Sequence, residues 1–212
     1  MSEPVREFAG PSGQLECLID SPAGEPRAAV VFAHPLPTEG GTMHTKVVYQ
    51  SAKALARIGC IVLRFNFRGV GRSAGTWDAG PGELDDYRAA VDFMAARHPG
   101  LEIWAAGFSF GSHIALTAGV DDDRICALIG IAPPVDKYDY SKVKASAKPK
   151  FIIHGSEDEL IPLQAVRQFY AQLPEPKEMI EIDRANHLFE GQASEVGDVL
   201  EDLLVDFTCK TP

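Results

Sequence analysis

Cysteine is scarce in this chain. Its 212 residues contain four, at positions 17, 60, 126 and 209. A zinc knuckle or a redox motif needs two cysteines a few residues apart, so this wide spacing excludes both classes of site. Cys60 and Cys126 each begin an apolar run, which is typical of a buried strand. We therefore expect inert, buried thiols at these two positions rather than disulfides.

Basic side chains are also few. Twenty lysines and arginines stand against thirty acidic residues, which gives a net charge of −10. Proteins that bind nucleic acid or an anionic membrane need clustered basic side chains. We therefore expect no nucleic acid and no membrane as a partner.

Long apolar segments are absent as well. The longest charge-free apolar stretch covers residues 125–135, whereas a transmembrane helix needs about 20 apolar residues. The first residues lack the basic region and the apolar run of a signal peptide. These absences predict a soluble, cytoplasmic protein.

Hydrophobic residues, in contrast, make up 45% of the chain, which is enough for a full core. From residue 28 onward, short apolar runs alternate with segments of helical periodicity, and this alternation predicts βαβ units. We expect an α/β fold with a single domain over residues 1–212. It should be a doubly wound, mostly parallel sheet with helices on both faces. Residues 5–20 could add one or two antiparallel edge strands.

The apolar patterns also place the individual elements. Strands are expected at residues 28–33, 60–67, 103–108, 125–132, 151–153 and 178–183, and helices at 47–58, 84–94, 110–118, 166–173 and 196–207. Residues 133–149 contain few large apolar side chains, so they predict a short loop or one turn of helix and not a lid domain. Ligands bind such sheets at the carboxyl ends of the strands. The loops that directly follow the strands are therefore the candidate site.

The third of these loops carries a Gly-x-Ser-x-Gly motif at residues 107–111, centred on Ser109. A strand is predicted before it and a helix after it, which is the setting of a nucleophile elbow. The serine of an elbow lies in a strained turn, and small residues two positions to either side let the backbones pass. The motif predicts Ser109 as a nucleophile, and the alternative interpretation is a glycine-rich packing turn.

A serine nucleophile needs a base, and the base needs an acid that orients it. The loop after the fifth predicted strand contains Asp158, and the loop after the sixth contains His187. Both positions are at the carboxyl ends of strands and follow Ser109 in the order serine, acid, histidine. Glu157 and Glu159 are rival acids next to Asp158, and Asp136 is a more distant one.

The chain resembles the α/β-hydrolase superfamily from about residue 13 onward. The matching segments are His-Pro-Leu-Pro at 34–37, the turn at 66–75, the elbow, His-Gly-x-x-Asp at 154–158 with Ile-Pro at 161–162, and Asn-His-x-Phe at 186–189. More closely, the chain is similar to small bacterial hydrolases related to dienelactone hydrolases and to the catalytic domain of prolyl oligopeptidases. The run Gly-Gly-Thr-Met at 40–43, with Lys-Val-Val at 46–48, suggests a lidless subgroup of these enzymes.

The resemblance implies roles for three residues: Ser109 as nucleophile, Asp158 as acid and His187 as base. The implied activity is that of a serine hydrolase, which cleaves a carboxylic ester or thioester of a small substrate through an acyl-serine. A peptidase, an amidase or an acyltransferase would use the same residues. A binding protein that keeps the hydrolase fold without catalysis is the alternative from another class.

The resemblance also implies an oxyanion hole made of two backbone N–H groups. One belongs to Phe110, and the other to a residue of the 34–37 loop. Pro35 has no N–H, so Leu36 is the candidate for the second donor. His34 is expected to organise this loop rather than to react.

Two further patterns favour structural roles. Residues 69–74 nearly match a dinucleotide-binding fingerprint, but that motif must open a helix, and the glycine- and proline-rich residues 75–82 cannot form one. The segment is therefore predicted to be a structural turn. His113 and His154 are expected in the core or in hydrogen bonds, and the spacing of the histidines does not suit a metal. We expect no cofactor and no metal.

Overall fold

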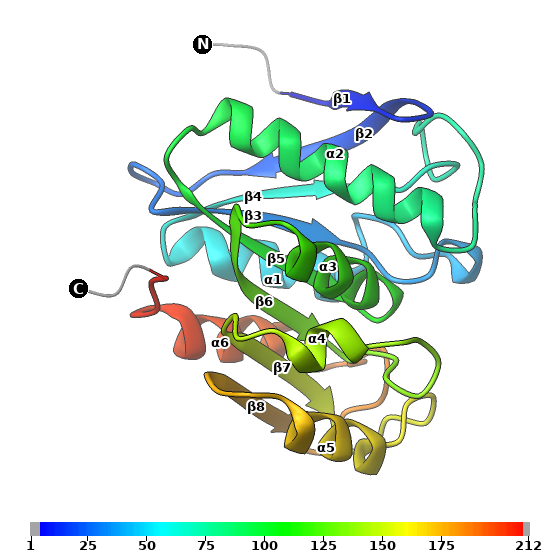
Figure 1. Ribbon diagram of the computed structural model, residues 1–212, viewed down its shortest axis with the longest axis vertical. Coiled ribbons are helices and arrows are strands. Elements are labelled where there is room, and N and C mark those ends of the chain that lie inside the picture. Colours follow the sequence, from blue (N-terminus) through cyan, green and yellow to red (C-terminus); the bar gives the residue numbers. More distant parts are fainter. Residues whose placement is uncertain (1–4, 210–212) are drawn as a thin grey trace.

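The computed structural model describes residues 5–209, and these form one eight-stranded sheet with helices on both faces (Figure 1). The strands are β1 (Glu7–Gly10), β2 (Gly13–Asp20), β3 (Ala28–Ala33), β4 (Cys60–Phe65), β5 (Glu102–Phe108), β6 (Ile125–Ile131), β7 (Lys150–Gly155) and β8 (Lys177–Ile182). Their order is β1-β2-β4-β3-β5-β6-β7-β8. Strands β3 to β8 are parallel, and β1 and β2 are antiparallel strands at one edge. The predicted doubly wound, mostly parallel sheet is confirmed.

Two hydrophobic layers attach the helices to this sheet. The helices are α1 (Lys46–Arg57), α2 (Pro81–Arg97), α3 (Phe110–Asp121), α4 (Ser141–Ala145), α5 (Leu163–Gln172) and α6 (Ala193–Leu204). Successive side chains of a strand point to opposite faces, so Val31 of β3 packs with α2 and α3, whereas Val30 and Phe32 pack with α1 and α6. Because both faces are covered, every residue of β3 is buried. Within residues 5–209, no helix is long and apolar enough to cross a bilayer.

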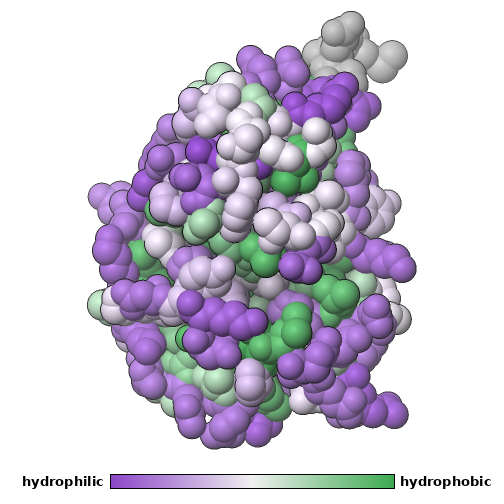
Figure 2. Space-filling view, turned by 90° about the vertical axis from the view of Figure 1, so that its right-hand side faces the viewer, coloured by the Kyte–Doolittle hydropathy of each residue, from purple (hydrophilic) through white to green (hydrophobic). Residues whose placement is uncertain are grey.

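The strand order reverses at β3, which lies between β4 and β5. After β3 the chain adds β4 along one side of this strand. It then returns and adds β5 along the other side. At such a switch point the loops that follow the two neighbouring strands diverge and open a crevice at the carboxyl edge. This edge is on the right of Figure 1 and faces the viewer in Figure 2.

The connection between β6 and β7 contains no lid. Its single helix, α4, has five residues. Tyr140 and Val143 are buried there against the core that α2, α3 and α5 share. The connection therefore lies close against the body of the protein, as its composition predicted.

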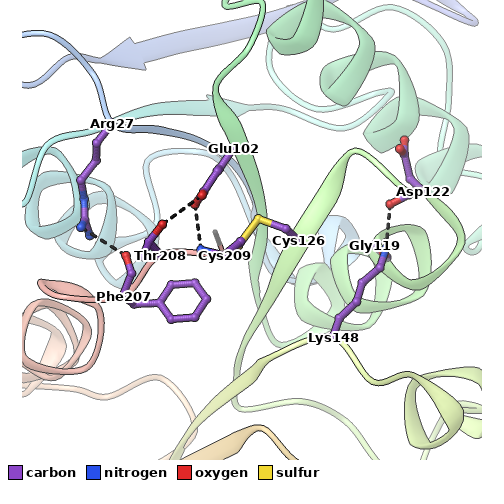
Figure 3. Close-up of a disulfide and its surroundings, with 9 residues drawn as sticks. All are labelled: Arg27, Glu102, Gly119, Asp122, Cys126, Lys148, Phe207, Thr208 and Cys209. Carbon is purple, nitrogen blue, oxygen red and sulfur yellow. Dashed lines mark hydrogen bonds between the residues drawn. A yellow bond between two sulfur atoms is a disulfide. The ribbon is translucent and has the colours of Figure 1, made fainter. Parts of the chain in front are cut away.

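The prediction for Cys126 is wrong, because this residue forms a disulfide with Cys209 (Figure 3). Cys126 is near the amino end of β6, and the chain after α6 returns to this edge of the sheet. Glu102, at the start of β5, accepts hydrogen bonds there from the Thr208 hydroxyl (3.0 Å) and the Cys209 N–H (3.1 Å). The two cysteines are 83 residues apart, so no local pattern announces the bridge.

The prediction for Cys60 is correct. Cys60 and Cys17 are both buried and free. Burial raises the pKa of the Cys60 thiol to about 11 and that of Cys17 to about 12. A thiol reacts as its thiolate, so both side chains are unreactive at neutral pH.

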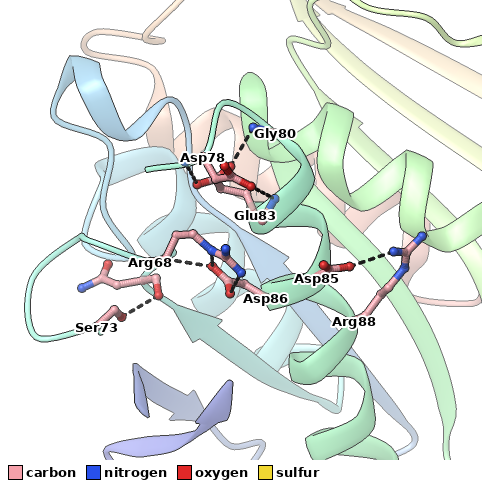
Figure 4. Close-up of polar contacts among 10 residues, drawn as sticks. Arg68, Ser73, Asp78, Gly80, Glu83, Asp85, Asp86 and Arg88 are labelled. Carbon is pink, nitrogen blue, oxygen red and sulfur yellow. Dashed lines mark hydrogen bonds and ion pairs between the residues drawn. The ribbon is translucent and has the colours of Figure 1, made fainter. Parts of the chain in front are cut away.

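The segment at 66–80 forms turns, and the next helix begins only at Pro81 (Figure 4). Arg68 fixes these turns to α2, because its guanidinium and its backbone N–H all donate to the buried Asp86. The Glu83 carboxylate accepts from the backbone N–H groups of Asp78 and Gly80. The structural turn predicted for this segment is thus present, without the helix that a dinucleotide fingerprint requires.

Candidate active site

Ser109 lies in the sharp turn between β5 and α3, with φ 52° and ψ −122°. This left-handed conformation is strained for a residue with a side chain. A Cβ atom on Gly107 would lie 2.2 Å from the Gly111 carbonyl oxygen, and one on Gly111 would lie 2.4 Å from that of His34. Both glycines are therefore required for the backbones to pass, and the turn presents Ser109 at the carboxyl edge.

The structure brings Ser109 together with His187 and Asp158. The Ser109 Oγ atom is 2.9 Å from His187 Nε2, and His187 Nδ1 is 2.7 Å from Asp158 Oδ2. His187 follows β8 and Asp158 follows β7, so three loops of the same sheet edge meet here. The ring nitrogens of a neutral imidazole are one donor and one acceptor. With Nδ1–H donating to Asp158, Nε2 is left to accept the Ser109 hydroxyl proton.

Asp158 is held in an ionised, oriented state by its own loop together with His187. Its Oδ1 atom accepts from the backbone N–H groups of Leu160 (2.9 Å) and Ile161 (2.8 Å). Burial would raise the pKa of the Asp158 carboxyl, but the hydrogen bonds from His187 and Ile161 outweigh it and lower this pKa below its usual range. The carboxylate is therefore charged at neutral pH.

The three rival acids do not contact the His187 ring. Glu157 and Asp136 are exposed, and no ion pair or hydrogen bond within residues 5–209 links either side chain to His187. Glu159 accepts from the His187 backbone N–H through Oε2 at 3.2 Å. This contact joins the two loops, and sequence reasoning missed it because nothing local relates positions 159 and 187.

Leu36 and Phe110 line the same cavity as Ser109. Phe110 is the first residue of α3, where backbone N–H groups lack helical partners and the helix dipole favours negative charge. Within residues 5–209, neither N–H donates to a protein acceptor. Two backbone donors without a protein acceptor, on residues that line the cavity of Ser109, could bind a negatively charged oxygen there.

His34 orders the loop that carries Leu36. Its Nε2 atom accepts from the Phe67 backbone N–H (3.1 Å), and its Nδ1–H donates to the Pro35 carbonyl (2.7 Å). Burial lowers the pKa of His34 to about 4, so the ring is neutral under ordinary conditions and keeps both bonds. His34 therefore links the Pro35 carbonyl group to the backbone that follows β4.

The Gly-Gly-Thr-Met run is anchored by residues that sequence reasoning overlooked. Arg64 of β4 is buried, pairs with Asp20 (2.6 Å) and donates to the Met43 carbonyl at 2.8 Å. The Asn66 side chain accepts from the Met43 N–H, also at 2.8 Å. An arginine within an otherwise apolar strand was the available signal, because a buried charge needs a partner.

The other two histidines flagged in the sequence lie beside this site rather than in it. The His113 ring stacks on Tyr138, with their centroids 4.1 Å apart. His154 Nε2 is 2.9 Å from the Ile161 carbonyl oxygen and closes the loop that carries Asp158. These contacts match the structural roles expected from the sequence.

A cavity of about 500 Å³ opens from Ser109 to the carboxyl edge. Figure 2 shows hydrophobic side chains gathered in the middle and lower part of this face, bordered by polar ones. The cavity is lined by Pro35, Leu36, Glu39, Gly41, Ser109, Phe110, Pro134, Lys137, Tyr138, Glu159, Leu160, Ile161, His187 and Leu188. It is therefore mainly apolar, with two carboxylates and one ammonium group.

Possible metal ligands gather elsewhere. Among residues 5–209, one group of three lies close enough together, namely Glu102, Cys126 and Cys209 at the amino edge of the sheet. The two sulfur atoms of this group are bonded to each other. This group therefore lies at the opposite edge of the sheet from Ser109.

Known proteins resemble this chain in sequence and structure. A family model described as serine aminopeptidase, S33, matches residues 24–150. The structure of an α/β serine hydrolase homologue from Coxiella burnetii is 38% identical, with a TM-score of 0.90 and coverage of 96% of this chain and 98% of that one. A Xanthomonas campestris protein described as an α/β serine hydrolase without a lid is 36% identical, with a TM-score of 0.89 and coverage of 97% and 95%. An uncharacterised Rickettsia prowazekii protein is 35% identical over 208 residues, which cover 93% of this chain and 87% of that protein. The chain therefore belongs to the serine aminopeptidase S33 family of the α/β-hydrolase superfamily, and it is a hydrolase.

Proposed function

We propose that this hydrolase cleaves carboxylic esters or thioesters of small substrates through an acyl intermediate on Ser109. The observation that carries the proposal is the continuous chain of hydrogen bonds from Ser109 Oγ through His187 to the buried Asp158. Its Ser109 end lies in a cavity that Leu36 and Phe110 also line, and the backbone N–H groups of these two residues donate to no acceptor within residues 5–209. This combination supplies a nucleophile, its base and a place for the developing negative charge.

The reaction follows from these positions. His187 Nε2 takes the Ser109 proton as Oγ attacks the substrate carbonyl carbon. The N–H groups of Phe110 and Leu36 stabilise the oxyanion of the tetrahedral intermediate. His187 then gives the proton to the leaving alcohol or thiol, and a water molecule repeats the sequence to release the acid. Asp158 keeps the imidazole in the required tautomer and stabilises its cation.

Amide cleavage is the second candidate. The family model is described as a serine aminopeptidase, and the same groups can protonate a leaving amine. A panel that pairs acyl esters, thioesters and aminoacyl amides with equal acyl parts distinguishes the two candidates. We expect the esters and thioesters to be turned over faster, and a preference for the amides would reverse the assignment.

Labelling with a fluorophosphonate tests whether the serine is activated. We expect stoichiometric modification of the native protein at Ser109, located by peptide mass spectrometry, because only a deprotonated hydroxyl attacks the phosphorus rapidly. Ser141 on α4, whose hydroxyl donates to the Asp139 carboxylate and not to a histidine, serves as the internal control and should stay unmodified. A folded protein that remains unlabelled at Ser109 would be a binding protein on a hydrolase fold.

The missing lid predicts a preference for short acyl chains. Since α4 cannot enclose the cavity, each methylene beyond its wall stays in water and gains little of the roughly 0.8 kcal/mol that full burial provides. We expect kcat/KM for p-nitrophenyl esters to peak at short chains, without a jump in rate at a lipid interface. A steady rise from acetate to palmitate would contradict this reading of the β6–β7 connection.

A further inference from the structure

The geometry points to a subsite for an apolar, uncharged leaving group, formed by Leu160 and Leu188. This inference rests on the proposed function, because it concerns the alcohol, phenol or thiol that the reaction releases. Both side chains line the cavity that opens from Ser109, and each is 51% exposed.

The chemistry of the reaction decides on which side of Ser109 the leaving group lies. Its oxygen or sulfur must receive a proton from His187 Nε2, so it has to be within hydrogen-bonding distance of that atom. The carbonyl oxygen has to face the N–H groups of Leu36 and Phe110 instead. The leaving group is thereby directed towards the His187 wall of the cavity.

Leu160 and Leu188 make up the exposed apolar part of that wall. Leu188 directly follows His187, and Leu160 directly follows Glu159, whose carboxylate accepts from the His187 N–H. A second bond joins the same two loops, from the Glu157 N–H to the Ala185 carbonyl (3.0 Å). The two leucines therefore project from adjoining loops that are fixed to each other.

Few large hydrophobic side chains are exposed among the described residues, and two of them are these leucines. Within residues 5–209, the large hydrophobic side chains classed as exposed are Tyr49, Leu160, Leu188 and Val205. Single exposed apolar residues are ordinary on a protein surface, whereas a pair at the wall of a cavity indicates apolar contact with a ligand. A ring or a branched alkyl group of the substrate would cover both side chains and remove them from water.

The charges around the cavity select against anionic leaving groups. The carboxylates of Glu39 and Glu159 border the cavity, and Lys137 is its only lysine or arginine within the described residues. Glu159 is next to Leu160, so a phosphorylated or carboxylated leaving group would meet like charge there. The subsite thus fits a neutral phenol, alcohol or thiol and disfavours a nucleotide-linked thiol.

The test compares phenyl acetate with 4-tert-butylphenyl acetate, which share the acyl group and release phenols of similar acidity. We expect wild-type kcat/KM to favour the tert-butyl ester, and the double variant Leu160→Ser/Leu188→Ser to reduce this preference about tenfold. Leu160→Met/Leu188→Met should keep it, since methionine preserves the apolar contact. Val205→Ser is the matched control, because Val205 is 49% exposed but follows α6, away from the cavity.

The outcomes separate this inference from the proposed function. Hydrolysis of both acetates with a preference that the serine variants leave unchanged would overturn the subsite and leave the esterase proposal intact. If the serine variants instead changed the acyl-length preference measured with the p-nitrophenyl ester series, the leucines would belong to the acyl side, which also overturns the subsite. Absence of turnover together with absence of fluorophosphonate labelling would overturn the proposed function itself.

Discussion

Ser109→Ala is expected to lower kcat by roughly 10⁶-fold, and the double variant Ser109→Ala/His187→Ala should be no slower than the single one. The reason is that the base acts only through the hydroxyl it deprotonates, and Ser109 Oγ is its hydrogen-bonded partner at 2.9 Å. Once that hydroxyl is removed, His187 has no proton to accept. The two losses are therefore not additive.

Steady-state kinetics on one activated ester, with all variants measured in parallel, check this expectation. The residual activity of Ser109→Ala should reflect the oxyanion donors and substrate binding alone, because both donors are backbone N–H groups that the substitution leaves in place. Losses that multiply in the double variant would show that the two residues act in separate steps. Such a result would remove Ser109 and His187 from a common mechanism.

Much of the fold could be predicted because its signals are local. The alternation of apolar runs and helical periods is a property of neighbouring residues, and it identified strands β3 to β8 and the helices between them. The elbow at Ser109 was also recognisable, since the serine, its flanking glycines, the strand and the helix are contiguous in the sequence. Loops after successive parallel strands share one edge of the sheet, which is why Asp158 and His187 could be placed near Ser109.

The features that escaped prediction depend on pairs of residues that are far apart in the chain. Cys126 looked like a buried thiol because its own neighbours are apolar, and only the return of the chain after α6 brings Cys209 to it. The position of Met43 in the loop beyond His34 depends on Arg64 and Asn66, which belong to β4 and the turn after it. No periodicity within either segment encodes such contacts.

The loop at residues 34–37, which carries the proposed oxyanion donor Leu36, shows how these distant contacts bear on the proposed function. Its order depends on His34, and the ring of His34 depends on the Phe67 backbone N–H as a donor. The Phe67 ring in turn packs against Phe110, with centroids 5.9 Å apart. The two proposed oxyanion donors, Leu36 and Phe110, are thereby fixed by one shared neighbour from the loop after β4. Their relative position could not be obtained from either motif alone.

Asp158→Asn is expected to slow turnover at neutral pH by about 10⁴-fold, with little change in the fold. The asparagine amide has the same shape, but it can present an N–H group to His187 Nδ1 in place of an acceptor. The imidazole would then carry its proton on Nε2, where it cannot accept the proton of Ser109. The loss should appear in kcat, because the substrate does not contact this buried side chain.

Glu157→Gln and Glu159→Gln are the matched controls, since each removes one carboxylate charge from the same loop. Glu157 is exposed, and a glutamine at 159 keeps the oxygen that accepts from the His187 N–H at 3.2 Å. Both variants should therefore retain activity within a few-fold of the wild type. If Glu157→Gln were inactive while Asp158→Asn remained active, the acid would be Glu157. The hydrogen bond of 2.7 Å between Asp158 and His187 would then be structural, and the loop after β7 would have to rearrange during turnover to bring the other carboxylate to the ring.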